Sequence, residues 1–269
     1  MLGSIVGDIV GSIYEFANIK TKDFEFFQPE MERTDDSILC IATADWLLHG
    51  GEVSHYYSRY ALEYPYPMGG YGGMFKAWSS KVARQGIHEP YNSCGNGSAM
   101  RIAPVGWAFE TEREVLAAAE VSASCTHNHP EGIKGAQATA LCIFLARQGH
   151  TASDIRARIE RDFGYDLSMS VKELQRRYSW QGIDGKGDGG ICQDSVPQAI
   201  ICALQAKDFE DAIRNAISIG GDSDTIGCIA GGIAEALYGI PESIKERAWK
   251  YLDETEGRTV RSFIQKYSI

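Results

Sequence analysis

The stretch that decides the fold is Gly220-Gly221-Asp222-Ser223-Asp224-Thr225-Ile226-Gly227, in which two carboxylates stand one residue apart. The following run of small apolar residues predicts a tightly packed helix from Ile226 to Tyr238. Asp222, Asp224 and Thr225 would therefore offer three oxygen ligands to a hard cation from one short turn. The alternative is an acidic first turn that caps the helix and complements its dipole.

A second stretch has the same chemistry. Thr34-Asp35-Asp36-Ser37 again combines threonine with paired aspartates, and it opens an apolar helix predicted from Ile38 to Leu48. Two such starts indicate two helix ends that face each other around cations. Four carboxylates in one place would repel one another strongly unless metal ions neutralise them.

Charge and cysteine content limit the classes of function. The 269 residues include 26 Lys plus Arg and 36 Asp plus Glu, a formal net charge of −10, without a basic cluster. This balance argues against nucleic acid as the main partner. The seven cysteines are scattered and form no Cys-x-x-Cys pair, which favours reduced thiols and a cytoplasmic location.

The pattern of the whole chain predicts one all-α domain over residues 1–269. We find no linker, low-complexity tract or charge block, and period-two alternation is nearly absent. No segment is apolar and long enough to span a bilayer, and the first residues lack a basic leader, so we expect neither a signal peptide nor membrane insertion. Nothing indicates an oligomer, so a monomer is the default expectation.

The N-terminal segment 2–16 predicts a core helix with a smooth face. Gly3, Gly7 and Gly11 recur every four residues, which would let another backbone approach closely. Asp8 and Glu15 are acidic residues in apolar surroundings. Burial beside aromatic neighbours would raise the pKa of Glu15 and suit it to proton transfer, whereas the alternative is a surface glutamate at a helix end.

Three further stretches are candidates for ligand binding. Segment 64–73, rich in Tyr, Pro and Gly, could form one wall of a pocket, but its spacing matches no phosphate-binding loop. The turn at 93–97, Ser-Cys-Gly-Asn-Gly, could bind phosphate through backbone amides or be an ordinary loop. His127 and His129 lack a third zinc ligand at useful spacing, so we expect one to bond a ligand and the alternative is helix capping.

Taken together, these stretches resemble the ADP-ribosylglycohydrolase family, which includes the dinitrogenase reductase-activating glycohydrolase. The resemblance covers nearly the whole chain in the family's order. Its motifs are Gly7-Asp8 with Glu15-Phe16, Thr34-Asp35-Asp36, Gly95-Asn96-Gly97-Ser98-Ala99-Met100-Arg101, Thr126-His127 and Gly221-Asp222-Ser223-Asp224-Thr225. The chain departs from the family, or cannot be compared with it, at Cys94 and in segment 51–92.

The resemblance implies a compact orthogonal helix bundle with a dinuclear cleft for two Mg²⁺ ions, or Mn²⁺ in their place. It implies that the metal ligands are Thr34, Asp35, Asp36, Asp222, Asp224 and Thr225. It implies that Ser93, Gly95, Asn96 and Gly97 hold the diphosphate and ribose, with His127 beside the ribose. Glu15 would act at the scissile bond as acid, base or gate, together with the catalytic carboxylates Asp35 and Asp36. Asp8 is expected to orient a ligand or to cap backbone groups.

The implied activity is metal-dependent hydrolysis of the bond that joins ADP-ribose to a modified protein side chain, with arginine favoured and serine as a second acceptor. Cations would orient water and ribose hydroxyls, and a carboxylate would take the proton of that water. Two alternatives remain open. One is a non-catalytic ADP-ribose binder or structural relative, because a fold does not guarantee its function. The other is a two-metal phosphohydrolase, which would release AMP instead of ADP-ribose.

Overall fold

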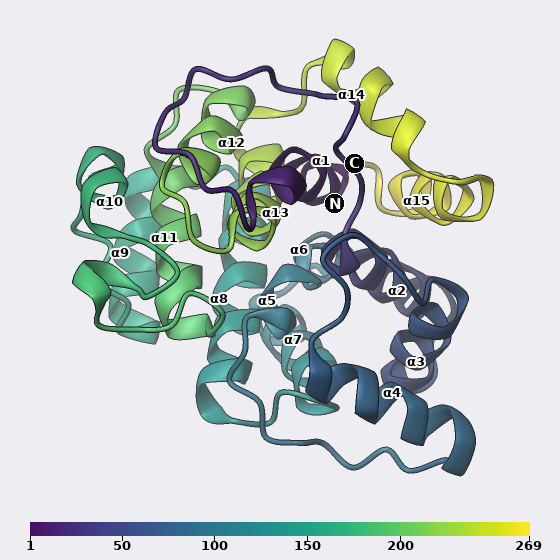
Figure 1. Ribbon diagram of the computed structural model, residues 1–269. Helices are drawn as coiled ribbons and strands as arrows, with labels where there is room; N and C mark the ends of the chain where they lie inside the picture. The colour runs from purple at the N-terminus through teal and green to yellow at the C-terminus, as the bar shows by residue number, and fades with distance from the viewer.

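Two antiparallel helices form the centre of the computed structural model, which describes residues 1–269 (Figure 1). These are α1 (Leu2–Gly11) and α13 (Ser223–Tyr238). A Cβ atom added to Gly227 would lie 2.5 Å from the carbonyl oxygen of Gly7, and one added to Gly7 would overlap the carbonyl oxygen of Gly227. The predicted smooth glycine face is therefore confirmed. This contact holds the first turn of α13, with its two aspartates, against the end of α1.

Further helices surround this pair. Helix α13 also packs against α8 (Pro130–Arg147), α11 (Cys192–Leu204) and α12 (Phe209–Ser218). Helix α2 (Asp35–His49) packs against α1 and against the C-terminal helix α15 (Glu254–Tyr267). Because α13 is enclosed, its residues from Ser223 to Glu235 are all buried.

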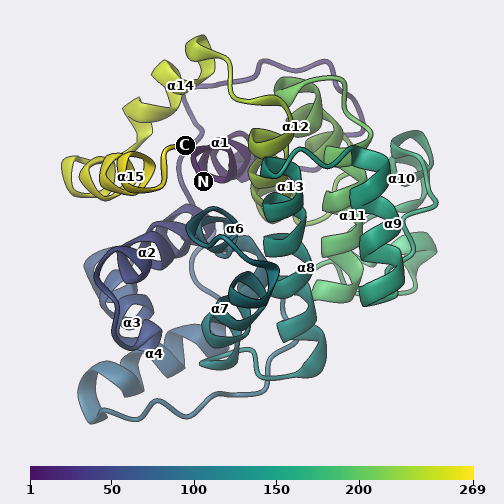
Figure 2. The same cartoon turned by 180° about the vertical axis from the view of Figure 1, so that it is seen from behind.

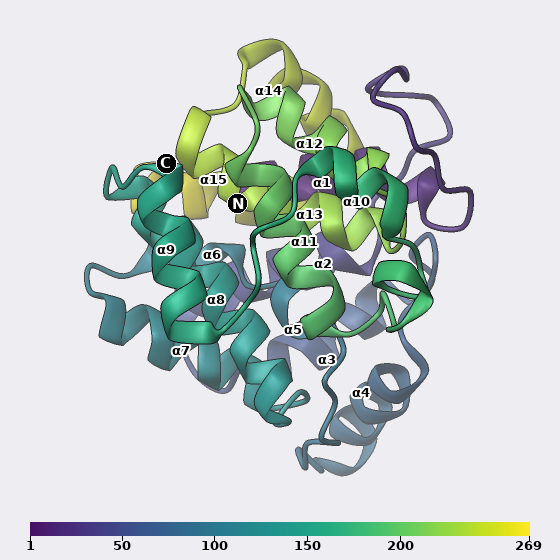
Figure 3. The ribbon, with the colours of Figure 1, turned by 90° about the vertical axis from the view of Figure 1, so that its left-hand side faces the viewer.

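The remaining elements are also helical. They are α3 (Val53–Glu63), α4 (Gly73–Gln85), α5 (Gly97–Met100), α6 (Ala103–Ala108), α7 (Glu112–Ser124), α9 (Ala152–Phe163), α10 (Val171–Arg177), α14 (Glu242–Ala248) and the 3₁₀ turns Ser12–Tyr14, Ile183–Gly185 and Trp249–Tyr251. Figure 2 shows α6, α7 and α8 side by side, and Figure 3 shows α9, α10 and α11 together on one side. No strand forms, which confirms the all-α prediction. None of these helices combines the length and apolar character needed to cross a membrane.

Local sequence signals place most helix starts. Capping boxes are present at Thr111–Glu114 before α7 and at Ser170–Glu173 before α10. Asp208 caps α12 through the backbone amide of Asp211. All seven cysteines are unpaired thiols, and the cytoplasmic location stays a prediction.

Some boundaries differ from the predictions. Helix α3 was not expected, because the Gly, Tyr and Pro content of segment 51–92 obscures the buried stripe of Val53, Tyr57, Tyr60 and Ala61. The apolar run from Met100 to Phe109 is not one helix, since α5 ends at Met100 and α6 begins at Ala103 with a proline in its first turn. The core helix predicted over residues 2–16 ends at Gly11 and is followed by the 3₁₀ turn Ser12–Tyr14.

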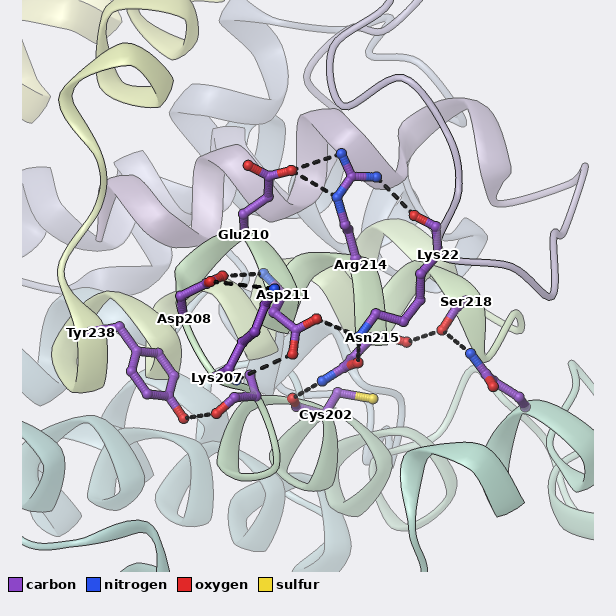
Figure 4. A network of polar contacts seen from close by, with 12 residues as sticks. Lys22, Cys202, Lys207, Asp208, Glu210, Asp211, Arg214, Asn215, Ser218 and Tyr238 are labelled. Carbon is purple, nitrogen blue, oxygen red and sulfur yellow. Dashed lines mark hydrogen bonds and ion pairs between the residues drawn. The ribbon is translucent and has the colours of Figure 1, made fainter.

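The long segment between α1 and α2 is fastened to α12 by polar contacts (Figure 4). The Lys22 ammonium contacts Asp211 and lies 2.8 Å from Oδ1 of Asn215. The Arg214 guanidinium donates to the carbonyl oxygen of Lys22 at 2.8 Å. It also donates to the carbonyl oxygen of Phe24 at 2.8 Å. These contacts fix the chain that follows Glu15 to a helix that itself packs on α13.

Candidate active site

The predicted site residues meet at a cavity of about 570 Å³. The first turns of α2 and α13 lie on it, together with the start of α5 and the loop before α4. All the predicted residues except Thr34 line it, namely Glu15, Asp35, Asp36, Ser93, Gly95, Asn96, Gly97, His127, Asp222, Asp224 and Thr225. The two acidic helix starts, far apart in sequence, thus face one cavity.

Carboxylate oxygens gather in two overlapping groups within this site. Oxygens of Asp8, Asp36 and Asp224 lie within 4.8 Å of one another, and so do oxygens of Glu15, Asp222 and Asp224. Asp224 belongs to both groups and therefore joins them. Asp35 lines the cavity and is half-buried, outside both groups.

Burial and mutual repulsion make these carboxyl groups weaker acids in the metal-free chain. Burial and then the charge of Asp224 raise the pKa of Asp36 well above its usual value, and burial and Asp222 do the same for Asp224. Burial raises the pKa of Asp222 to about 6. Burial, followed by the charges of Asp224 and Asp8, raises the pKa of Glu15 to about 8.

The donor set fits a hard divalent cation. Oδ1 of Asp36 is buried without a hydrogen-bond partner, so one carboxylate oxygen in the cluster lacks any compensating contact from the protein. Oxygen donors at close spacing are the ligands that Mg²⁺ and Mn²⁺ take in proteins. A cation would also remove the repulsion that raises the pKa values.

Asp8 holds the start of α2 in place. Its Oδ2 accepts hydrogen bonds from the backbone amides of Thr34 at 3.0 Å and Ser37 at 3.1 Å, and its Oδ1 accepts from Oγ1 of Thr34 at 2.6 Å. Asp8 thus caps backbone groups, as expected. The Thr34 hydroxyl also accepts from the amide of Asp36 at 3.2 Å and is fully buried, so Thr34 supports the cavity wall from behind.

The turn before α5 joins the two sides of the cavity. Nδ2 of Asn96 donates to Oδ2 of Asp222 at 2.7 Å. The amide of Gly95 bonds to Oγ of Ser93 at 3.0 Å and the amide of Asn96 to the carbonyl of Gly190 at 3.0 Å, so these two amides are already occupied. Neither glycine of Gly-Asn-Gly has a positive φ. Gly97 instead leaves room for His127, whose Nε2 would lie 3.2 Å from an added Cβ.

A buried arginine holds the imidazole that lines the cavity. Nη2 of Arg101 donates to Oγ1 of Thr126 at 2.7 Å and to the carbonyl of Ser122 at 2.7 Å, and its guanidinium lies 4.0 Å from the ring centroid of Tyr57. Oγ1 of Thr126 lies 2.7 Å from Nδ1 of His127. Burial and the charge of Arg101 lower the pKa of His127 well below its usual value, so this imidazole is neutral.

The two histidines have separate tasks. Nδ1 of His129 accepts a hydrogen bond from the backbone amide of Glu131 at 3.1 Å and so caps α8, while His127 lines the cavity. Arg101 belongs to one of the motifs that resemble the family, but we predicted no role for it in the site. The signal in the sequence was a charged residue inside an otherwise apolar run. The structure buries this charge fully.

The glycine-rich loop forms another wall, as the sequence predicts for segment 64–73. Gly69 to Phe75 line the cavity, and a Cβ added to Gly69 would lie 2.7 Å from Oε2 of Glu15. Gly69 has a φ of +74°, which favours glycine in any case. Gly190, in the loop before α11, also lines the cavity because Ile191 pairs with Gly95. The sequence did not assign this loop to the site.

Comparisons with known proteins agree with this architecture. The family model described as ADP-ribosylglycohydrolase matches residues 1–267. A solved structure titled "ADP-ribosylglycohydrolase-related protein complex" has the same fold, with a TM-score of 0.69 and 24% identity over 98% of this chain and 95% of that one. The chain belongs to the ADP-ribosylglycohydrolase family and is a glycohydrolase.

Two curated relatives illustrate the similarity. Human ADP-ribosylhydrolase ARH3 is 29% identical over 95% of this chain and 89% of its own length. ADP-ribosylarginine hydrolase Tri1 from Pseudomonas putida (strain GB-1) is 26% identical over 93% of this chain and 73% of its own length.

Proposed function

We propose that this glycohydrolase removes ADP-ribose from modified protein side chains in a Mg²⁺-dependent reaction, with arginine as the favoured acceptor and serine as a second one. The observation that carries the proposal is the meeting of two acidic helix starts in one cavity that also contains Asn96 and His127. The names of the relatives support ADP-ribose removal, and the name of Tri1 supports arginine.

The residues proposed as ligands for two cations are Asp35, Asp36, Asp222, Asp224 and Thr225, which line the cavity. Thr34 lies behind the wall with its hydroxyl bonded to Asp8, so its ligand role stays a prediction. When bound, the cations would supply Lewis-acid activation of a water molecule and of the ribose hydroxyls. Asp8 and Asn96 would keep the carboxylates in position, since Asp8 caps α2 and Asn96 bonds to Asp222.

Glu15 is the residue proposed to move the proton. Hydrolysis forms a bond between the water oxygen and the anomeric carbon and breaks the bond from that carbon to the acceptor nitrogen or oxygen. Glu15 as a carboxylate would take one proton of the water and, as the carboxylic acid, would give it to the leaving nitrogen or oxygen, so that atoms and charge balance and the carboxylate is regenerated. His127 is neutral and would hold the ribose by a hydrogen bond from or to Nε2, while Ser93 and Gly97 would contact the diphosphate side.

Release of free ADP-ribose tests the proposal. Peptides carrying ADP-ribosyl-arginine or ADP-ribosyl-serine are incubated with the protein and Mg²⁺, or with EDTA. We expect Mg²⁺-dependent release, faster from the arginine peptide. Release of AMP would identify a phosphohydrolase, and binding of ADP-ribose without any release would identify a binder.

A further inference from the structure

An exposed pair of aromatic rings lies directly beside the proposed catalytic glutamate. Phe16 follows Glu15 in sequence, and 77% of its surface is exposed to solvent. Its ring stacks on that of Trp180, with the ring planes 4° from parallel and the centroids 6.3 Å apart. A phenylalanine this exposed gains nothing from the core, so a role in binding is a better account of its position.

The pair is attached to the rim of the cavity on both sides. Nε1 of Trp180 donates to the carbonyl oxygen of Glu15 at 2.8 Å, which fixes the backbone that carries the proposed catalytic carboxylate. The carbonyl of Trp180 accepts from the amide of Gly189 at 2.7 Å, and a Cβ added to Gly190 would lie 3.9 Å from the indole ring. Since Glu15 and Gly190 both line the cavity, the rings stand at its edge.

The chemistry of this edge suits a cation. The faces of aromatic rings attract guanidinium and ammonium groups, and guanidinium also stacks on them as a plane. The one cationic side chain that lines the cavity, Arg101, is fully buried, so it does not compete for the rings. The chain as a whole has a formal net charge of −10. A positively charged peptide segment would therefore find two aromatic faces at this rim, on a protein whose overall charge attracts it.

We propose that Phe16 and Trp180 form an acceptor platform that binds the polypeptide next to the ADP-ribosylated residue and favours acceptors with flanking arginine or lysine. This inference rests on the proposed function, because it assigns the protein side of the same substrate. The platform is distinct from the residues proposed to hold ADP-ribose, which lie in the turn that leads into α5 and in the loop before α8. It therefore affects acceptor choice and leaves ADP-ribose binding unchanged.

The test compares Phe16→Ala with wild type on two peptides that carry the same ADP-ribosyl-arginine, one flanked by lysines and one by glutamates. We expect KM for the lysine peptide to rise about three- to thirtyfold in the variant, the range of a cation–aromatic contact. The preference of wild type for the lysine peptide should disappear. The inhibition constant of free ADP-ribose should stay the same, and Phe16→Tyr should behave as wild type.

Other results would overturn the platform. An equal loss of affinity for free ADP-ribose would place Phe16 on the nucleotide instead, and an unchanged KM for both peptides would remove it from substrate binding. Val121→Ala is the matched control, since Val121 is an exposed apolar residue on α7 that does not line the cavity. If wild type released no ADP-ribose from either peptide, the same pair would be tested with ADP-ribosyl-serine. No release from that pair either would overturn the proposed function, and the platform with it.

Discussion

Gly7 of α1 and Gly227 of α13 face each other so closely that neither has room for a side chain. The contact sets the register of the two helices, because Gly11 then lies against Asp224, where an added Cβ would be 2.5 Å from Cα. Glu15 follows four residues after Gly11. The pairing of two glycines thus determines where the proposed acid–base group and the acidic first turn of α13 meet.

Substitution of Gly7 tests this relationship. Gly7→Ala forces a methyl group into the backbone of α13, so we expect the free energy of unfolding to fall by about 3 kcal/mol, the upper end of overpacking effects. Gly73→Ala is the control, because no atom lies within 4 Å of an added Cβ there and the first turn of α4 accepts alanine. Urea unfolding followed by circular dichroism gives both values. Equal stabilities of the two variants would contradict the register argument.

The helix starts of the site were predictable because they depend on local sequence. Thr34 and the aspartates that follow it have the composition of a helix N-terminus, and so do Asp222 and Asp224. That the two starts face each other follows from charge reasoning, since so many carboxylates in apolar surroundings need a common counter-ion. The resemblance to the family assigned Asn96 and His127 to the site, through the Gly-Asn-Gly and Thr-His motifs that contain them.

Other features depend on tertiary contacts that no local pattern contains. Asp8 reaches the carboxylate cluster only because α1 is buried beside both acidic turns. Gly69 comes to Glu15 because Met68 pairs with Thr34, across more than thirty residues of sequence. The sequence left the Gly-Asn-Gly turn open between a phosphate-binding turn and an ordinary loop, and it did not indicate that Gly97 is needed for the close approach of His127.

The carboxylate cluster predicts an unusual dependence of stability on pH. A carboxyl group whose pKa is higher in the folded than in the unfolded chain keeps its proton longer when folded. The free energy of unfolding therefore falls as pH rises from about 4, which is the pKa of the carboxyl group in the unfolded chain, through its pKa in the folded chain. The folded pKa is about 6 for Asp222 and about 8 for Glu15, so the loss extends to about pH 8 without metal. His127 acts in the opposite direction, and only below about pH 6.5.

Thermal unfolding between pH 6.5 and pH 8.5, with EDTA and with Mg²⁺, measures this effect. We expect Tm in EDTA to fall by several degrees from pH 6.5 to pH 8.5, because each kcal/mol lost from the free energy of unfolding lowers Tm by about 2–4 °C. Mg²⁺ should raise Tm, and the increase should grow with pH because metal competes with protons for the carboxylates. A Mg²⁺-induced increase that is the same at both ends of the range would contradict the assignment.

Asp224→Asn tests the effect of the carboxylate cluster on stability and its effect on activity separately. Asp224 belongs to both carboxylate groups, so removal of its charge relieves repulsion, and the EDTA-treated variant should be more stable than wild type at pH 8. The increase in Tm with Mg²⁺ should shrink, and release of ADP-ribose should fall at least about a hundredfold.

Asp35→Ala should also abolish turnover while the fold is retained. Asp23→Asn, at an exposed site, is the control. Turnover like that of wild type in both site variants would disprove the metal assignment.

Thr126→Val tests whether the buried arginine positions His127. Valine keeps the shape of threonine but removes the hydroxyl that lies 2.7 Å from both Nη2 of Arg101 and Nδ1 of His127. Nδ1 then loses the partner that fixes its tautomer, so we expect the ¹⁵N shifts of the His127 ring to move toward a mixture of tautomers. Because one buried hydrogen bond is worth about 1–1.5 kcal/mol, kcat/KM should fall by about tenfold.

Thr126→Ser keeps the hydroxyl and should restore both the shifts and the rate. A purely structural role would lower Tm in Thr126→Val without changing the tautomer, and that result would remove Arg101 and Thr126 from substrate positioning.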